Sequence, residues 1–286
     1  MRRNFIVLLL ACAASFIQAQ NNQSADLPHR EWKASWITHP TAPLREPLVL
    51  HFRRTLTLSA VPPSYIVRVS ADNRFILYVN GRRVGDGPAR GDLTHWRYER
   101  FDLAPFLQPG SNLITATVWN FGVYAPIAQI SDRTAFLLES EAEGDTSTST
   151  PTQWLVEIEP GHKALPRVPN GFWAYMAQGP GEELDADQYD WSWNSADAKG
   201  GAWLPAASPI RESVYPTTNK AHSADDTADN PWGLVPDQLP PMEYAATDPG
   251  AERLNRDLNS TDPLNNTIAG RLGFPNTQLP VPPHSH

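Results

Sequence analysis

Apolar residues at every second position dominate the first half of the chain, which is the pattern of half-buried β-strands. Between Leu48 and Leu58, five of the six even-numbered positions are apolar. The same alternation occurs over 64–70 and 74–79, and the dipeptide Asn80-Gly81 follows as a tight-turn signal that permits positive φ at both positions. The sequence therefore predicts a long strand followed by a β-hairpin.

Further alternating segments predict strands at 96–101, 113–119, 134–139 and 154–158. Helical periodicity is nearly absent. The segment 102–107 allows one short helical turn capped by Asp102, because Pro105 and Pro109 prevent a longer helix. Many short strands separated by turns, without alternating helices, predict an all-β sandwich of antiparallel layers rather than a parallel sheet.

Two segments lack the strand pattern. The acidic, Thr- and Ser-rich stretch 141–151 lies between two predicted strands, so we interpret it as a long hairpin loop. From Pro216 onward, eleven prolines fall in 71 residues, and such a segment cannot bury enough apolar surface to offset its ordering entropy. We therefore expect a β-sandwich over 32–215 and an extended, poorly structured linker or tail over 216–286.

The first nineteen residues have the features of an export signal, because Arg2 and Arg3 precede an apolar run that ends in small residues. Cys12 leaves a second option, a lipoprotein box in which this cysteine becomes the acylated first residue. We expect ordinary cleavage after Ala19, since the apolar stretch continues past Cys12, and a disordered leader over 20–31. The protein is then exported to the periplasm or the extracellular space. No other segment approaches the roughly 20 apolar residues of a membrane span.

The net charge restricts the classes of partner, and the cysteine content indicates what stabilises the fold. A net charge of -8 repels phosphate backbones and anionic lipid, which argues against nucleic acid and membrane surfaces. Cys12 is the only cysteine, so the cleaved chain forms no internal disulfide and its stability depends on the core. A hydrophobic content of 41% is enough to build one. Neutral ligands are the class of partner that the net charge does not disfavour.

Signatures of nucleophilic or metal chemistry are missing from the sequence. It contains no Gly-x-Ser-x-Gly motif and no two histidines with i, i+4 spacing. Gly85, Gly87 and Gly91 have the wrong spacing for a phosphate-binding loop and open no helix, so we interpret them as part of a turn.

Glycoside cleavage needs paired carboxylates held about 5 to 9.5 Å apart across a cleft. The only dense acidic cluster near aromatic residues contains Glu182, Glu183 and Asp185. Acidic clusters on glycine-rich loops are usually solvated or bonded to backbone, so we expect no catalytic residue in this cluster. A chain that is an active hydrolase by itself is the least favoured of the functions considered.

Aromatic residues give a stronger indication of a ligand, because several of the ten tryptophans lie beside polar residues. Sugar-binding sites pair an aromatic platform with planar hydrogen-bonding side chains, although most tryptophans of β-proteins belong to the core. Polar residues flanking the hairpin are expected on loops at one end of the sandwich, where binding residues gather. The candidate carbohydrate-binding residues are Asn73, Arg74, Asp86, Arg90, Asp92, Trp96, Trp119 and Asn120.

Three segments, Ser70–Gly85, Trp96–Leu107 and Gly110–Asn120, resemble the amino-terminal domain of bacterial alpha-L-rhamnosidases. The third segment is shared with galactose-binding-like jelly rolls in general. The order of the shorter motifs makes the resemblance specific to the rhamnosidases, since Ala34-Ser-Trp-Ile37 opens the region and Ala202-Trp203 comes late in it. The resemblance covers residues 32 to 245, where Leu239–Glu243 is similar to a connector ahead of the next β-domain.

The resemblance implies a galactose-binding-like jelly-roll β-sandwich from an exported, inverting glycoside hydrolase. In that family the catalytic acidic residues lie on a helical barrel that follows the front domains. The sequence stops at His286, before any such barrel, so we expect a truncated or free-standing chain that is inactive alone.

Front domains of the family support the barrel, and in some members they bind terminal rhamnose with a calcium ion. No calcium-ligand pattern is matched here, so calcium is implied by the resemblance alone, and no other cofactor is expected. We expect a non-catalytic accessory or carbohydrate-binding region whose partner is a rhamnose-containing polysaccharide. The alternative is a purely structural fragment that packs against a catalytic domain and has no ligand of its own.

Overall fold

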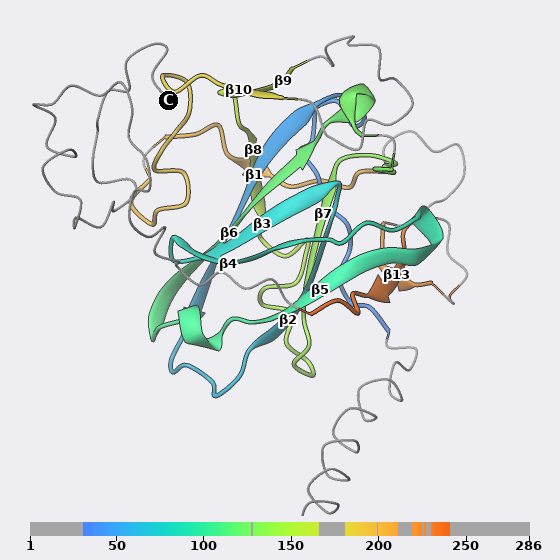
Figure 1. Ribbon diagram of the computed structural model, residues 1–286. Coiled ribbons are helices and arrows are strands. Elements are labelled where there is room, and N and C mark those ends of the chain that lie inside the picture. The colour runs from blue at the N-terminus through green and yellow to red at the C-terminus, as the bar shows by residue number, and fades with distance from the viewer. Residues whose placement is uncertain are drawn as a thin grey trace, which may run out of the picture. The chain divides into compact units, whose positions relative to one another are not determined.

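The computed structural model describes residues 31–126, 128–165, 181–198, 200–210, 219–224, 226 and 230–240. Within them, two β-sheets pack face to face as a sandwich (Figure 1). The six-stranded sheet has the order β11-β8-β1-β6-β3-β4, the five-stranded sheet has the order β12-β13-β5-β2-β7, and β9 pairs with β10. The prediction of an all-β sandwich is confirmed.

The six-stranded sheet contains β1 (Leu48–Leu58), β3 (Arg74–Val79), β4 (Arg82–Gly87), β6 (Gly110–Asn120), β8 (Leu155–Ile158) and β11 (Leu204–Pro205). The five-stranded sheet contains β2 (Ile66–Asp72), β5 (Trp96–Asp102), β7 (Ala135–Ser140), β12 (His222–Ser223) and β13 (Gly233–Pro236). The separate pair is β9 (His162–Ala164) with β10 (Glu182–Leu184), and the short 3-10 helices are η1 (Leu93–His95), η2 (Ala104–Phe106) and η3 (Gly122–Tyr124).

The first strand and the first hairpin form where the hydrophobic alternation predicts them. β1 pairs with β6 along its whole length, from Leu48 opposite Asn120 to Leu58 opposite Gly110. The turn between β3 and β4 has positive φ at both central residues, 53° at Asn80 and 75° at Gly81. Such a turn matches the right-handed twist of the strands that it joins.

The main core lies between the two sheets. Phe52 of β1, Phe75 of β3 and Phe136 of β7 are fully buried there, and the ring centroids of Phe52 and Phe136 are 5.1 Å apart. Inward side chains alternate with outward ones along each strand. Along β3 this alternation leaves Arg74, Ile76 and Tyr78 on the outer face of the six-stranded sheet, partly exposed.

A second core covers the outer face of the five-stranded sheet. Trp32, Trp36, Trp96 and Trp232 are buried together in it, and the rings of Trp36 and Trp232 are 4.5 Å apart. The segment that begins at Trp32 packs on this face, and a hydrogen bond from the Trp36 N–H to the Asn219 carbonyl at 2.7 Å joins it to the residues just before β12. This face of the sandwich is therefore closed.

The end of the sandwich differs from the prediction. β13 pairs in parallel with β5, with Leu234 opposite Trp96, so the sheet continues into the predicted tail and is not wholly antiparallel. This segment forms a strand although it is rich in proline, because Trp232 and Leu234 are buried in the second core.

Two smaller expectations are also corrected. Residues 141–151 do not close a hairpin, because β7 and β8 belong to different sheets and the segment crosses from one to the other. Gly85 and Gly87 lie in β4 rather than in a turn. A Cβ atom at Gly85 would overlap the ring of Phe101 on β5, so the missing side chain lets the two sheets approach at this edge.

The predicted export signal, the leader up to residue 30 and most of the predicted tail lie outside the described residues. The chain divides into two compact units, Met1–Gln238 and Leu239–His286, and the sandwich belongs to the first. Among the residues that the structure places, no helix has the length and apolar character to cross a membrane.

Candidate functional site

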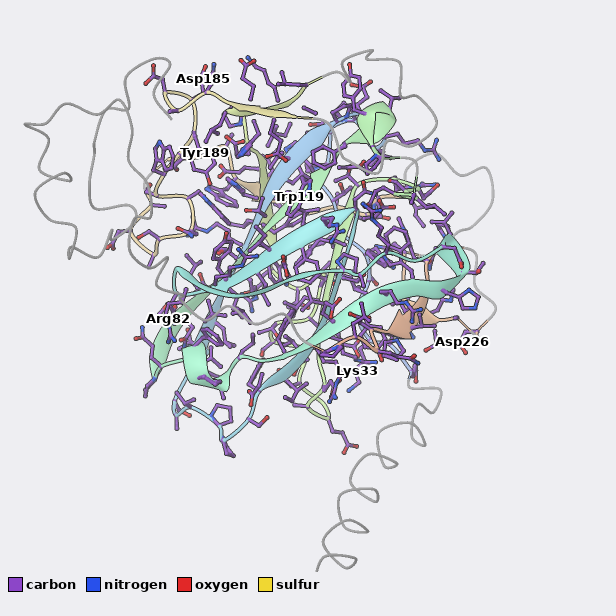
Figure 2. The ribbon with its side chains drawn as sticks, in the orientation of Figure 1. Lys33, Arg82, Trp119, Asp185, Tyr189 and Asp226 are labelled. Atoms are coloured by element: carbon purple, nitrogen blue, oxygen red, sulfur yellow. The ribbon has the colours of Figure 1, made fainter. Side chains whose placement is uncertain are left out.

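The outer face of the six-stranded sheet carries an open group of polar and aromatic side chains, which we call the Trp119 surface. Arg74 of β3 lies opposite Trp119 of β6, while Ile76 lies opposite both Thr117 of β6 and Asp86 of β4. Directly opposed residues of antiparallel strands project to the same side. All five residues are partly exposed, and Figure 2 shows Trp119 within the sheet.

The charges of three side chains act on the Arg74 guanidinium at one end of this surface. Burial lowers the pKa of Arg74, and Arg90 lowers it further, whereas Asp86 and Glu99 act in the opposite direction. These electrostatic effects require the groups to be near one another. The structure thus brings together three predicted residues, Arg74, Asp86 and Arg90, and adds Glu99, which sequence reasoning missed.

Glu99 extends from β5 to the edge where β4 crosses it. Gly87 leaves the space for this side chain, and the Ala89 N–H donates to its Oε1 at 3.1 Å. Burial, followed by the hydrogen-bonded carboxylate of Asp237, raises the pKa of Glu99 to about 7. Carboxyl groups bonded to each other leave no room for a glycosidic bond between them, so this pair does not have the geometry of a glycosidase.

Asn73 and Asn120 belong to a buried network that centres on Asp72. The Asp72 carboxylate accepts hydrogen bonds from Asn73 Nδ2 at 2.8 Å and from Ser131 Oγ at 2.6 Å, and Asn120 Nδ2 donates to the same Ser131 Oγ at 2.9 Å. Trp232 Nε1 donates to the carboxylate at 3.1 Å. Burial raises the pKa of Asp72 to about 6. Both asparagines are buried, so they position the loop that carries Ser131 rather than face solvent.

Asp92 and Trp96 have structural partners of their own. The Asp92 carboxylate caps η1 by accepting hydrogen bonds from the backbone of Thr94 at 2.8 Å and of His95 at 2.9 Å. Hydrogen bonding by the Thr94 side chain is the main reason that the pKa of Asp92 falls to about 2. Trp96 is buried in the second core and donates to the Ala71 carbonyl at 3.3 Å, so it offers no surface to a ligand.

The acidic cluster lies apart from these residues on β10 and the turn that follows it. Glu182 and Glu183 are exposed on β10, opposite Ala164 and Lys163. The Asp185 carboxylate accepts from the Asp187 N–H at 3.1 Å, which is the bonding of a turn.

The described residues give no side-chain cluster for the calcium ion that the family resemblance implies. They contain no group of three or more His, Cys, Asp or Glu side chains arranged to hold a metal. We therefore derive no step through a metal ion.

An aromatic wall borders the Trp119 surface. The Trp193 ring stacks on the His51 ring with centroids 3.8 Å apart and meets the edge of the Tyr78 ring at 5.7 Å. Trp193 Nε1 donates to the Tyr189 hydroxyl at 2.9 Å. Burial lowers the pKa of His51, although Glu157 opposes the change. Because Tyr78 follows Ile76 on the same face of β3, the wall adjoins the Trp119 surface.

Comparison with known proteins finds similarity in solved structures alone, because no family model and no curated protein matches the chain. The chain is similar to the GH78 family rhamnosidase of Bacillus sp. GL1, with 27% identity and a TM-score of 0.58 over 74% of this chain and 20% of that chain. It is also similar to the alpha-L-rhamnosidase from Dictyoglumus thermophilum, with 19% identity and a TM-score of 0.46 over 62% of this chain and 21% of that chain. The chain thus spans about a fifth of the length of these structures. The similarity to the Bacillus rhamnosidase confirms the resemblance to part of an alpha-L-rhamnosidase.

Proposed function

We propose that this chain is a non-catalytic, carbohydrate-binding region of an exported alpha-L-rhamnosidase-like glycoside hydrolase. The observation that carries the proposal is the strand register that sets Trp119 beside Arg74 on the open face of the sandwich. A sugar ring stacks its C–H face on an aromatic ring, while its hydroxyl groups bond to planar polar groups. Trp119 supplies the ring, and Arg74 and Asp86 supply a donor and an acceptor.

The ligand that suits this surface is a neutral glycan, and the similarity to a rhamnosidase favours one that contains rhamnose. Hydroxyl groups both donate and accept, and the arginine and carboxylate side chains around Arg74 serve both roles. The net charge of -8 disfavours polyanions. An open surface leaves much of the sugar in water, so we expect weak binding, with a Kd on the order of 0.1 to 1 mM per site.

Isothermal titration with methyl α-L-rhamnoside and with a linear rhamnan tests the proposal. W119A should weaken binding about tenfold, because it removes the ring on which the sugar stacks. W119F retains a ring and should keep part of the affinity. It therefore distinguishes a loss of stacking from a loss of the folded state as the cause of weaker binding. D92N is the matched control, since it alters an exposed residue whose carboxylate caps η1. A wild-type protein that binds no glycan, or W119A binding as tightly as wild type, would refute the proposal.

Lack of catalysis is tested separately with an aryl α-L-rhamnoside. Among the described carboxylates, Glu99 and Asp237 are bonded to each other, and Glu182 and Glu183 lie on an exposed strand. We expect no turnover above the rate without protein. Turnover that persists through repeated purification and disappears in E182Q or E183Q would contradict a non-catalytic role.

A second candidate function is structural support of a catalytic domain. It is favoured by exposed apolar side chains on three strands: Ile158 is 42% exposed, Leu184 is 43% exposed and Leu204 is 40% exposed. Exposed apolar groups of this kind mark contact surfaces when they form a patch. Strong binding of a hydrophobic dye together with self-association, and no glycan binding, would favour this function over the first.

A further inference from the structure

Trp191 is the most exposed of the tryptophans that the structure describes. It is 67% exposed, whereas Trp36, Trp154 and Trp232 are at most 1% exposed. An indole in water contributes little to the hydrophobic stabilisation of the fold. The position of Trp191 therefore calls for an explanation other than packing.

The Trp191 ring is held in place although it is exposed. Its Nε1 donates to the Ala186 carbonyl at 3.1 Å, and the Tyr189 ring approaches it edge-on with centroids 4.8 Å apart. The turn is fixed by Asp190, whose Oδ1 accepts from the Ser192 N–H at 2.9 Å and from its hydroxyl at 2.7 Å. A ring that is already ordered loses little conformational entropy when a ligand stacks on it.

The polar groups of this turn favour a neutral sugar as the ligand of Trp191. The indole N–H is already bonded within the protein, so the ring offers an apolar face and needs no acceptor from the ligand. Asp185, Asp187 and Asp190 on the same turn place negative charge near the ring, which repels anionic ligands such as uronic acid chains.

The turn is attached to the same outer face that carries the Trp119 surface. Trp193, two residues after Trp191, stacks on His51 of β1 and touches Tyr78 of β3. The ring centroid of Tyr189, a residue of this turn labelled in Figure 2, lies 6.0 Å from that of His51 on β1, the strand that pairs with β6. The turn that carries Trp191 therefore borders the same outer face as the Trp119 surface.

We propose that Trp191 is a second sugar platform, and that a neutral polysaccharide chain lies along this face in contact with both the Trp119 surface and Trp191. This inference rests on the proposed function and adds its ligand class, a polymer rather than a single terminal sugar. Two weak contacts on one chain raise the apparent affinity without any new contact, because the second binds at high effective concentration.

The test compares a polymer with a monosaccharide. W191A should bind a linear rhamnan about tenfold more weakly than wild type, since it loses the second contact, and should bind methyl α-L-rhamnoside with unchanged affinity at the Trp119 surface. W191F should keep most of the polymer affinity. W119A should weaken binding of both ligands. Because Trp191 is exposed, its replacement should leave the Tm unchanged, so loss of folding does not confuse the result.

Tryptophan fluorescence gives a second readout. Subtracting the spectrum of W191F from that of wild type isolates the emission of Trp191, which should shift to shorter wavelength when rhamnan is added. The inference is overturned if W191A binds rhamnan as tightly as wild type while W119A does not, and the proposed function then stands. It is also overturned if Trp191 responds to polygalacturonic acid or to a lysine-rich peptide but not to rhamnan. A wild-type protein that binds none of the glycans overturns both proposals.

Discussion

Replacing Glu99 by glutamine removes a carboxyl group that the fold keeps protonated to an unusually high pH. The pKa of Glu99 is raised to about 7 from an ordinary value of 4.5, by burial first and then by Asp237. The folded state therefore binds this proton more tightly than the unfolded state does. The resulting stabilisation is full below the ordinary pKa and is lost as the pH rises from 4.5 through about 7. The difference corresponds to about 3 kcal/mol, which screening at a half-buried site reduces to about 1 to 2 kcal/mol.

Urea unfolding of wild type and E99Q at pH 5 and pH 8 measures this effect. Glutamine has nearly the same size and can still donate a hydrogen bond to Asp237. We expect E99Q and wild type to have similar free energies of unfolding at pH 5, and E99Q to be more stable by about 1 to 2 kcal/mol at pH 8. E183Q, on exposed β10, is the matched control for the loss of one negative charge. If the stability of E99Q relative to wild type is the same at both pH values, the reasoning is refuted.

Three further substitutions probe the network, the aromatic wall and the sheet contact. D72N replaces one of the two acceptor oxygens of a buried network by an NH2 donor and should lower the free energy of unfolding in urea by about 2 to 4 kcal/mol, and an unchanged value would contradict the role assigned to Asp72. The buried His51 has a lowered pKa, so the unfolded chain takes up its proton first, and the contribution of His51 to stability should be lost as the pH falls below about 6.5. The stability of H51Q relative to wild type should therefore rise as the pH falls through this range in the same urea titration, and a difference that does not change with pH would exclude this effect of His51. G85A should cost about 1 to 3 kcal/mol because its methyl group meets the Phe101 ring, and the double variant with F101L should recover part of this loss.

Strands whose apolar side chains alternate could be predicted from the sequence, whereas strands defined by close packing could not. β1 begins and ends at Leu48 and Leu58, the residues that the alternation indicates. β4 has no such pattern, because Gly85 and Gly87 occupy the positions that face the other sheet. Their role becomes evident only from the approach of Phe101 and Glu99, which the sequence does not show.

The candidate site likewise contains residues that a local sequence pattern groups and residues that only the fold brings together. Arg74, Asp86 and Arg90 lie close together because one hairpin and its flanking residues carry them, so a local pattern was sufficient to group them. Glu99 joins them from the other sheet, and Trp193 joins His51 from a turn far along the chain. Contacts between distant segments of this kind depend on the register of the whole sandwich. Trp191 has a weaker signal in the sequence, as one of two tryptophans that flank Ser192, and nothing there indicates which of the two is exposed.

The distribution of tryptophans makes the two outer faces of the sandwich differ in their surfaces. On the five-stranded sheet, Trp32, Trp36, Trp96 and Trp232 close the face, because segments from both ends of the first unit bring apolar rings to it. No ligand can approach that sheet without displacing a buried core. Among the described residues, the turn that carries Trp193 covers part of the six-stranded sheet, and the strands present Arg74, Asp86 and Trp119 partly exposed. A glycan that binds a face of this sandwich therefore has one face available, and that face has aromatic rings and hydrogen-bonding groups side by side.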